Sequence, residues 1–126
     1  MFTLKKTLLA NATSCCIFGL IFLLLPLQTS LFLSASDQAP ELVIFILGCV
    51  LLFNAAHLIW ASFQAMHNKY LILYFSLGDL IWVIISLILL VSELWITTTA
   101  GIISTTLVSI IVGTFGLLQF IKIKDL

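Results

Sequence analysis

Charged side chains are scarce in this sequence. They make up 8% of its 126 residues, whereas hydrophobic residues make up 63%, and the mean hydropathy is +1.32. About a quarter of the residues in an ordinary soluble domain are charged, because they keep its surface in water. The scarcity of charge therefore excludes a soluble globular protein and predicts an integral membrane protein.

Patterns that mark several functional classes are also missing. The net charge is zero and there is no basic stripe, which argues against a nucleic-acid partner. No GxSxG motif, triad order, CxxC pair or paired-histidine metal spacing occurs, and His57 has no second axial partner for haem because His67 lies in a predicted loop. These absences predict a protein that is not an enzyme and holds no metal or cofactor. The three cysteines are expected to be small buried hydrophobic residues; they are Cys15, Cys16 and Cys49.

Long apolar segments, in contrast, use nearly the whole chain. A helix needs about 20 mainly apolar residues to cross a bilayer, and four segments qualify: residues 7–28, 42–63, 70–91 and 99–121. Lys5 and Lys6 before the first segment resemble the start of a secretory signal, but the length of the run and Pro26 after it favour a retained helix. We expect residues 1–126 to form one domain, an all-α, antiparallel four-helix membrane bundle.

The positions of the lysines predict the orientation of this bundle. All of them fall at the chain ends or in the second connection, whereas the charged residues of the first and third connections are all acidic. The positive-inside rule then places both termini in the cytoplasm of a multi-pass membrane protein. The lysines are Lys5, Lys6, Lys69, Lys122 and Lys124, and the acidic residues of the other side are Asp37, Glu41 and Glu93.

Polar residues inside the second and third segments are the best functional lead. If the two helices pair symmetrically about their short connection, Asn54 falls level with Asp79, and His57 falls level with Ser76. Trp82 and Ser86 follow Asp79 at helical spacing and share its face. We therefore take six residues as a candidate ligand-binding site or proton relay: Asn54, His57, Ser76, Asp79, Trp82 and Ser86.

The carboxylate of Asp79 limits what this face can be. A charged side chain near the bilayer centre costs about 2.5–3.5 kcal/mol on insertion scales, so it should face inward and find a partner. Three roles stay open for Asp79. It could anchor a structural hydrogen-bonded cluster with Asn54 and either Ser14 or Ser109, take part in a proton relay, or form a ligand-binding patch with Trp82 as a stacking wall.

Small residues recur every fourth position along the fourth segment. Such a ridge lets helices approach closely, so we interpret it as a packing surface within the bundle, with a homodimer seam as the alternative. It consists of Gly101, Thr105, Ser109 and Gly113, and Gly116 and Gln119 extend a similar face. In the first segment, a second face expected to pack inward contains Asn11, Ser14, Cys15 and Gly19.

Some of these residues carry a resemblance to known proteins. The opening Asn11-Ala12-Thr13-Ser14, Gly19 after it, and the run Asp79-Leu80-Ile81-Trp82-Val83 with Ser86 resemble small bacterial inner-membrane proteins with four transmembrane helices, which share the DoxX-like plan. This resemblance implies a fold and a location in the bacterial inner membrane, but no activity. Small multidrug resistance transporters fit less well, because they need a glutamate in the first helix. Vitamin K epoxide reductase-like proteins need a CxxC motif.

Two functional classes follow from these features. The first is a non-enzymatic accessory or binding protein that holds a membrane lipid, a lipophilic small molecule or a membrane protein partner in its bundle. The second is an oligomeric, proton-coupled transporter or channel that uses Asp79 and His57. The first is favoured because the chain has one acid inside its spans and no pair of glycine-interrupted helices.

Overall fold

The computed structural model describes residues 3–126, apart from the side chain of Asp125, and has no strand in that range. Residues 1 and 2 of the predicted domain lie outside the described residues. Four helices are long and apolar enough to cross a membrane, so the prediction of an all-helical protein with four such segments is confirmed. They are α1 (Leu4–Leu24), α3 (Glu41–Ser62), α4 (Lys69–Ser92) and α5 (Thr99–Lys122), and two short elements accompany them, α2 (Pro26–Leu33) and the 3-10 turn η1 (Ile123–Asp125).

The first predicted helix, residues 7–28, is wrong at its carboxyl end. Helix α1 ends at Leu24, and the chain turns before it continues as α2 with Pro26 at the first helical position. Proline has no N–H for the helical ladder and restricts the residue before it, so it ends one helix and starts another. The other three long helices begin and end within one residue of their predicted bounds.

Side chains before three of the helices explain where those helices begin. The Thr3 side chain accepts a hydrogen bond from the N–H of Lys6 at 3.2 Å, and that of Asn68 accepts one from Tyr70 at 2.8 Å. Thr98 does the same for Gly101 at 2.9 Å. Each bond satisfies an N–H group that the helix itself leaves without a partner.

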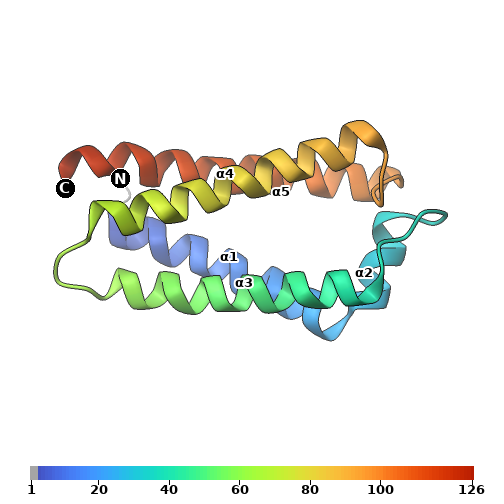
Figure 1. Ribbon diagram of the computed structural model, residues 1–126, viewed down its shortest axis with the longest axis horizontal. Helices are drawn as coiled ribbons and strands as arrows, with labels where there is room; N and C mark the ends of the chain where they lie inside the picture. The colour runs from blue at the N-terminus through green and yellow to red at the C-terminus, as the bar shows by residue number, and fades with distance from the viewer. Residues whose placement is uncertain (1–2) are drawn as a thin grey trace.

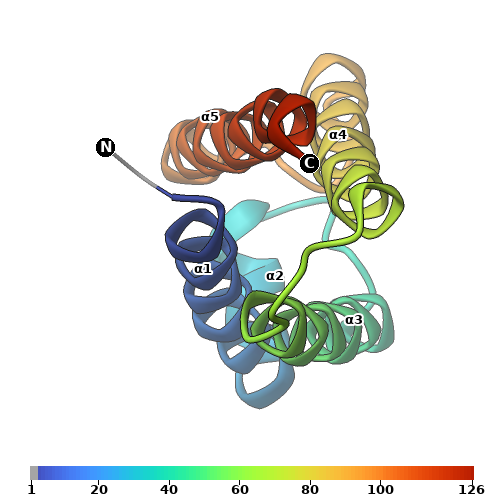
Figure 2. The same ribbon diagram turned by 90° about the vertical axis from the view of Figure 1, so that its left-hand side faces the viewer.

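The four long helices form two pairs. Helix α1 packs along α3, and α4 packs along α5, while the main contact between the pairs is that of α1 with α5 (Figures 1 and 2). Helices α3 and α4 share a short loop and touch through side chains near it, such as His57 and Phe75, but they do not pack closely along the rest of their length (Figure 1). The expectation that this loop makes them packed neighbours is therefore wrong for most of their length. Both chain ends and the α3–α4 loop lie at the same end of the molecule (Figure 1).

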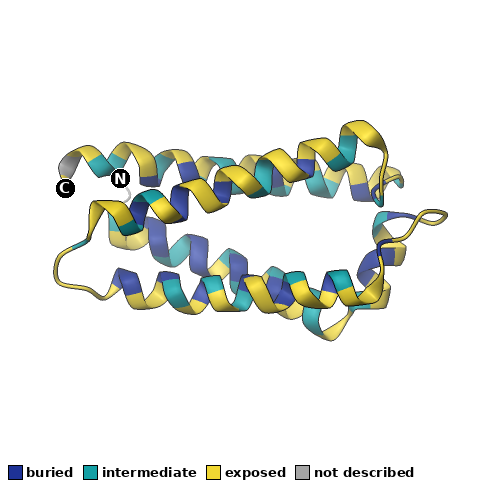
Figure 3. Ribbon diagram, viewed as in Figure 1, coloured by how far each residue is buried: buried dark blue, intermediate teal, exposed yellow. Residues whose placement is uncertain are grey.

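Large apolar side chains form a buried core on three of the long helices only. This core includes Leu8 on α1, Leu58 on α3, and Ile72 and Phe75 on α4. Helix α5 instead buries small or polar residues, which are Gly101, Ser109, Gly116 and Gln119. Much of the surface of every long helix is exposed (Figure 3), and it is mainly apolar.

A second link between the pairs, the α2–α5 junction, lies at the end opposite the termini. The carbonyl oxygen of Leu33 accepts hydrogen bonds from the N–H groups of Thr97 at 2.8 Å and Thr98 at 3.1 Å. The hydroxyl groups of Ser34 and Thr97 are 2.7 Å apart. Gly101 lies so close that an added Cβ would stand 2.9 Å from the carbonyl oxygen of Leu33. The end of α2 is therefore fixed on the start of α5.

Candidate functional site

Asp79 lies at the centre of a hydrogen-bonded cluster that joins three helices. Its side chain on α4 is only 6% exposed, and its Oδ2 accepts hydrogen bonds from Asn11 Nδ2 on α1 and Gln119 Nε2 on α5, both at 3.0 Å. Asn11 Nδ2 also donates to Gln119 Oε1 at 2.9 Å. The three side chains close a triangle, which we call the Asp79 cluster. These buried hydrogen bonds connect side chains of α1, α4 and α5.

A glycine allows α5 to reach the carboxylate. A Cβ added at Gly116 would lie 3.0 Å from Cβ of Asp79, which is tighter than ordinary packing allows. Gln119 follows three residues later, on the same side of the helix. The backbone of α5 can therefore lie against Asp79 while Gln119 donates to it.

The cluster extends to α3 through a cysteine. Cys15 Sγ donates to Asn11 Oδ1 at 3.7 Å, and Asn54 Nδ2 on α3 donates to Cys15 Sγ at 3.4 Å. The predicted pairing of Asn54 with Asp79 is thus corrected, because the hydrogen-bond partners of Asp79 are Asn11 and Gln119. Symmetric pairing about a loop requires that the two helices pack on each other, whereas α4 packs on α5 and α3 packs on α1.

His57 lies among aromatic rings and outside the Asp79 cluster. Its ring centroid is 5.2 Å from that of Phe75 and 5.9 Å from that of Tyr74, both on α4. Phe53 and Trp60 on its own helix complete the surroundings. Nδ1 of His57 is buried and has no hydrogen-bond partner among the described residues. The sequence predicts that His57 lies level with Ser76. In the structure it lies against Phe75 and Tyr74, one and two positions earlier on α4.

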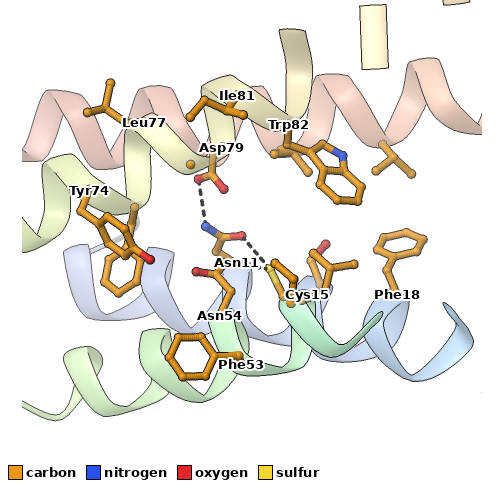
Figure 4. A pocket seen from close by; sticks show the side chains of 17 residues that line it. Asn11, Cys15, Phe18, Phe53, Asn54, Tyr74, Leu77, Asp79, Ile81 and Trp82 are labelled. Carbon is orange, nitrogen blue, oxygen red and sulfur yellow. Dashed lines mark hydrogen bonds between the residues drawn. The ribbon is translucent and has the colours of Figure 1, made fainter. Parts of the chain in front are cut away.

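The other predicted site residues on α4 have separate surroundings. Ser76 is buried and its hydroxyl has no partner among the described residues. Ser86 is also buried, and its Oγ donates to the carbonyl oxygen of Trp82 at 2.8 Å within the helix. Of the four predicted site residues on α4, only Asp79 and Trp82 line the same cavity (Figure 4).

The predicted small-residue ridge on α5 does not act as one surface. Gly101 belongs to the α2–α5 junction, whereas a Cβ added at Gly113 would meet only a methyl group of Val83, at 3.6 Å. Thr105 lines a cavity, and the buried hydroxyl of Ser109 has no partner in the described part of the chain. Gly116, further along the same helix, makes the closest approach to α4.

Two cavities lie between the helix pairs. The first has a volume of about 420 Å³ and is bordered by Asp79, Asn54 and several aromatic side chains (Figure 4). The second, also about 420 Å³, extends toward α2 and the α2–α5 junction. Phe18, Trp82 and Val108 line both and separate them. Such volumes are typical of sites that hold a small organic molecule.

One oxygen of Asp79 is available to the first cavity. Both hydrogen bonds to the carboxylate go to Oδ2, and Oδ1 accepts none from the described residues although it is not sealed away from the surface. Figure 4 shows this second oxygen on the side of Trp82. The other lining residues are mainly apolar, and Asp79 is the one acidic residue in the lining; polar atoms also come from Asn11, Ser14, Cys15, Asn54, Tyr74 and Trp82. A bound molecule with an N–H or O–H group could complete the carboxylate.

Comparison with known proteins finds no relative of this chain. No protein family matches the sequence, and no match was found among curated proteins or solved structures. The resemblance to small bacterial four-helix proteins therefore stays a prediction. In the described part of the chain, no group of three His, Cys, Asp or Glu side chains is placed to hold a metal ion.

Proposed function

We propose that the protein is a non-enzymatic, multi-pass protein of a bacterial inner membrane that binds a lipophilic molecule between its two helix pairs. The four long helices would cross the bilayer in alternating directions, with both termini in the cytoplasm. The first cavity would be the binding site, with Asp79 as its polar anchor and Trp82 as its aromatic wall.

The surface of the molecule supports the membrane part of this proposal. Leucine, isoleucine, valine and phenylalanine side chains are exposed along all four long helices, for example Leu24, Phe53, Ile88 and Leu107. Monomeric soluble proteins rarely expose continuous apolar surface on this scale, whereas lipid tails would cover it. The chain ends and the α3–α4 loop, which carry the lysines, lie together at one end (Figure 1). That arrangement favours a cytoplasmic position for this end.

The observation that carries the binding part is the half-satisfied carboxylate of Asp79. The Asp79 cluster satisfies Oδ2 and leaves Oδ1 toward an apolar cavity of about 420 Å³. A polar atom that faces an apolar space without a hydrogen-bond partner is unfavourable, so a donor from a bound molecule would stabilise it. A ligand, in contrast, would need one placed polar group in a mainly apolar pocket.

The proton-coupled transporter has weaker support. Asp79 is hydrogen-bonded to two amides, which do not exchange protons readily, and His57 is packed among aromatic rings outside the cluster. A relay would need titratable groups in hydrogen-bond reach of one another. A proton flux lost in both Asp79→Asn and His57→Ala, in protein that remains folded, would favour the transporter over binding.

Native mass spectrometry tests the proposed function directly. The protein is extracted in a mild detergent and its mass is compared with that of Val108→Phe, which adds bulk to the wall shared by both cavities. We expect a non-protein mass to stay bound to the original protein and to be lost from the variant. Leu107→Phe is the matched control, because Leu107 is 56% exposed and the same bulk there should leave the bound mass in place.

Two results would contradict binding in the cavity. One is a folded protein that carries no additional mass. The other is equal retention by Val108→Phe and Leu107→Phe, which would place the molecule on the outer surface. The same spectra give the number of subunits, and so also test whether the chain forms a homo-oligomer or carries a membrane protein partner.

A further inference from the structure

From the chemistry of the first cavity, we infer that its ligand is a small lipophilic amine, bound as an ammonium ion against Asp79 Oδ1 and the aromatic wall. This inference rests on the proposed binding function and specifies the ligand class. It depends on three features of the cavity: the partners of the carboxylate, the kind of side chains around it, and its depth.

The hydrogen-bond partners of Asp79 show which interactions its carboxylate still lacks. Both are neutral amides, which donate hydrogen bonds but carry no countercharge. The lysines all lie at the cytoplasmic-side ends of the helices, so none stands near the middle of α4. Oδ1 therefore has no donor among the described residues, and an ionised Asp79 would have no positive charge beside it, which is strongly unfavourable in an apolar interior. A protonated amine supplies the donor and the charge together.

Aromatic side chains around the carboxylate favour a cation over a neutral donor. Phe18, Phe53, Tyr74, Phe75 and Trp82 line the cavity with Asp79. The face of an aromatic ring attracts a cation, and the attraction grows when water is excluded. An alcohol would satisfy Oδ1 by one hydrogen bond but would gain nothing from these rings or from the charge. A fatty acid would place a second carboxylate beside Asp79.

The depth of Asp79 in the bilayer favours a small amine as the ligand over the amine of a lipid headgroup. Asp79 follows the first residue of α4, Lys69, by about 15 Å at the helical rise of 1.5 Å per residue. That distance is about half of a hydrocarbon core roughly 30 Å thick. The ammonium group of phosphatidylethanolamine stays at the membrane surface, whereas a small amine can bring its charged end to the carboxylate.

The test compares probes that share one tail. Trp82 is made the sole tryptophan by Trp60→Phe and Trp95→Phe, and the protein is placed in phosphatidylcholine nanodiscs. Its fluorescence is titrated with dodecylamine, dodecanol or dodecanoate, and binding is expressed against the measured bilayer content of each probe. We expect dodecylamine to bind at least tenfold more tightly than either other probe. Phosphatidylethanolamine added to the discs should not compete with it.

Variants identify the group that recognises the charge. Asp79→Asn should bring the affinity for dodecylamine down to that for dodecanol, while dodecanol binding changes little. Asp37→Asn is the matched control, because it removes one carboxylate from an exposed loop and should keep the preference for the amine. If Asp79→Asn does not fold, the probe series on the original protein still decides the question.

Each other outcome overturns a defined claim. Equal binding of dodecanol and dodecylamine, or a preference that survives Asp79→Asn, would overturn the amine while leaving a binding cavity. Competition by phosphatidylethanolamine would assign the site to a lipid headgroup and overturn the small amine. If no probe changes the fluorescence of Trp82, the amine assignment fails, and retention of another mass in native spectra would show that the cavity itself still binds.

Discussion

At the scale of single residues, the unusual feature is a buried carboxylate held by amides. A buried acid is commonly paired with a lysine or arginine, which cancels its charge and also replaces its water. Asn11 and Gln119 replace the water around Asp79 Oδ2 but bring no positive charge to it. The cluster therefore joins the helices without a countercharge, which is the feature on which the proposed amine ligand rests.

The side chain of Asn11 should contribute measurably to stability. Asn11→Leu removes the donor to Asp79 and Gln119 and the acceptor of Cys15, so three buried groups lose a partner. We expect the free energy of unfolding to fall by about 1–2 kcal/mol, measured by unfolding in mixed detergent micelles. Thr13→Leu, at an exposed position of the same helix, should change it by much less. Equal losses in the two variants would show that the cluster does not stabilise the fold.

The sequence identifies Asp79 as the central residue but does not identify its partners. Asn11 and Gln119 are recognisable as polar residues on inward faces of the first and fourth segments, and both are fully buried in the structure. Their contact with Asp79 is missed because the sequence-based pairing considers only the hairpin of the second and third segments. Which helices touch depends on side chains far apart in the sequence, whereas loop length only limits the distance between neighbouring ends.

At the scale of helices, α5 is held differently from the others. It buries glycine, serine and glutamine where α1, α3 and α4 bury large apolar side chains. Between membrane helices such small residues matter, because lipid offers apolar surface everywhere and close approach is what favours association. The position of α5 then depends on a few close contacts, of which Gly116 makes the closest one to Asp79.

Two glycines of α5 should respond in opposite ways to the same substitution. Gly116→Ala places a Cβ 3.0 Å from that of Asp79 and should destabilise the fold by about 1–3 kcal/mol. Gly113→Ala meets only a methyl group at 3.6 Å, so it should be neutral or stabilise by up to about 1 kcal/mol through helix propensity. Thermal unfolding in detergent compares them. Similar melting temperatures would contradict the close packing of α5 on α4.

The α2–α5 junction predicts a second matched pair on this helix. Thr98 Oγ1 accepts from the N–H of Gly101 and donates to the carbonyl oxygen of Phe32 at 2.6 Å. Thr98→Val removes both bonds and should lower the free energy of unfolding by about 1–2 kcal/mol. Thr106→Val loses only a bond to Ile102 within the helix and should cost little. Denaturation curves that coincide would show that the junction does not fasten α2 to α5.

Helix existence and bounds are the part of the fold that the sequence predicts well. Each long helix is an apolar run of spanning length with turn residues at its ends, and that information is local. Helix α2 is missed because Pro26 permits two local outcomes, a bend within one helix or the start of another. The choice is made by distant residues, since Thr97 and Thr98 hold the end of α2.

At the scale of the whole molecule, the two helix pairs are joined by hydrogen bonds at two places and by the apolar core near the α3–α4 loop. The Asp79 cluster links them near the middle, and the α2–α5 junction links them at the end away from the termini. The cavities lie along the space between these links, lined by residues of both pairs. The packing that leaves α3 and α4 apart is thus what makes room for a ligand.

The proposed orientation gives a prediction for the complete chain. A reporter enzyme that is active only outside the cytoplasm should be inactive when fused after Leu126 and active when inserted after Gln38, in the loop before α3. The lysines at the termini and α3–α4 loop cause this orientation through the positive-inside rule. A reporter inserted after Asn68 is the control and should be inactive. Activity after Leu126 and Asn68, with none after Gln38, would reverse the assignment.

The order of the partners along the chain has a consequence for biosynthesis. A ribosome makes α1 with Asn11 before α4 with Asp79, and α4 before α5 with Gly116 and Gln119. A nascent or truncated chain without α5 therefore holds its carboxylate with one donor, uncovered on the side where α5 belongs. The synthesis of α5 therefore supplies the second donor of Asp79 and brings the backbone at Gly116 against its side chain.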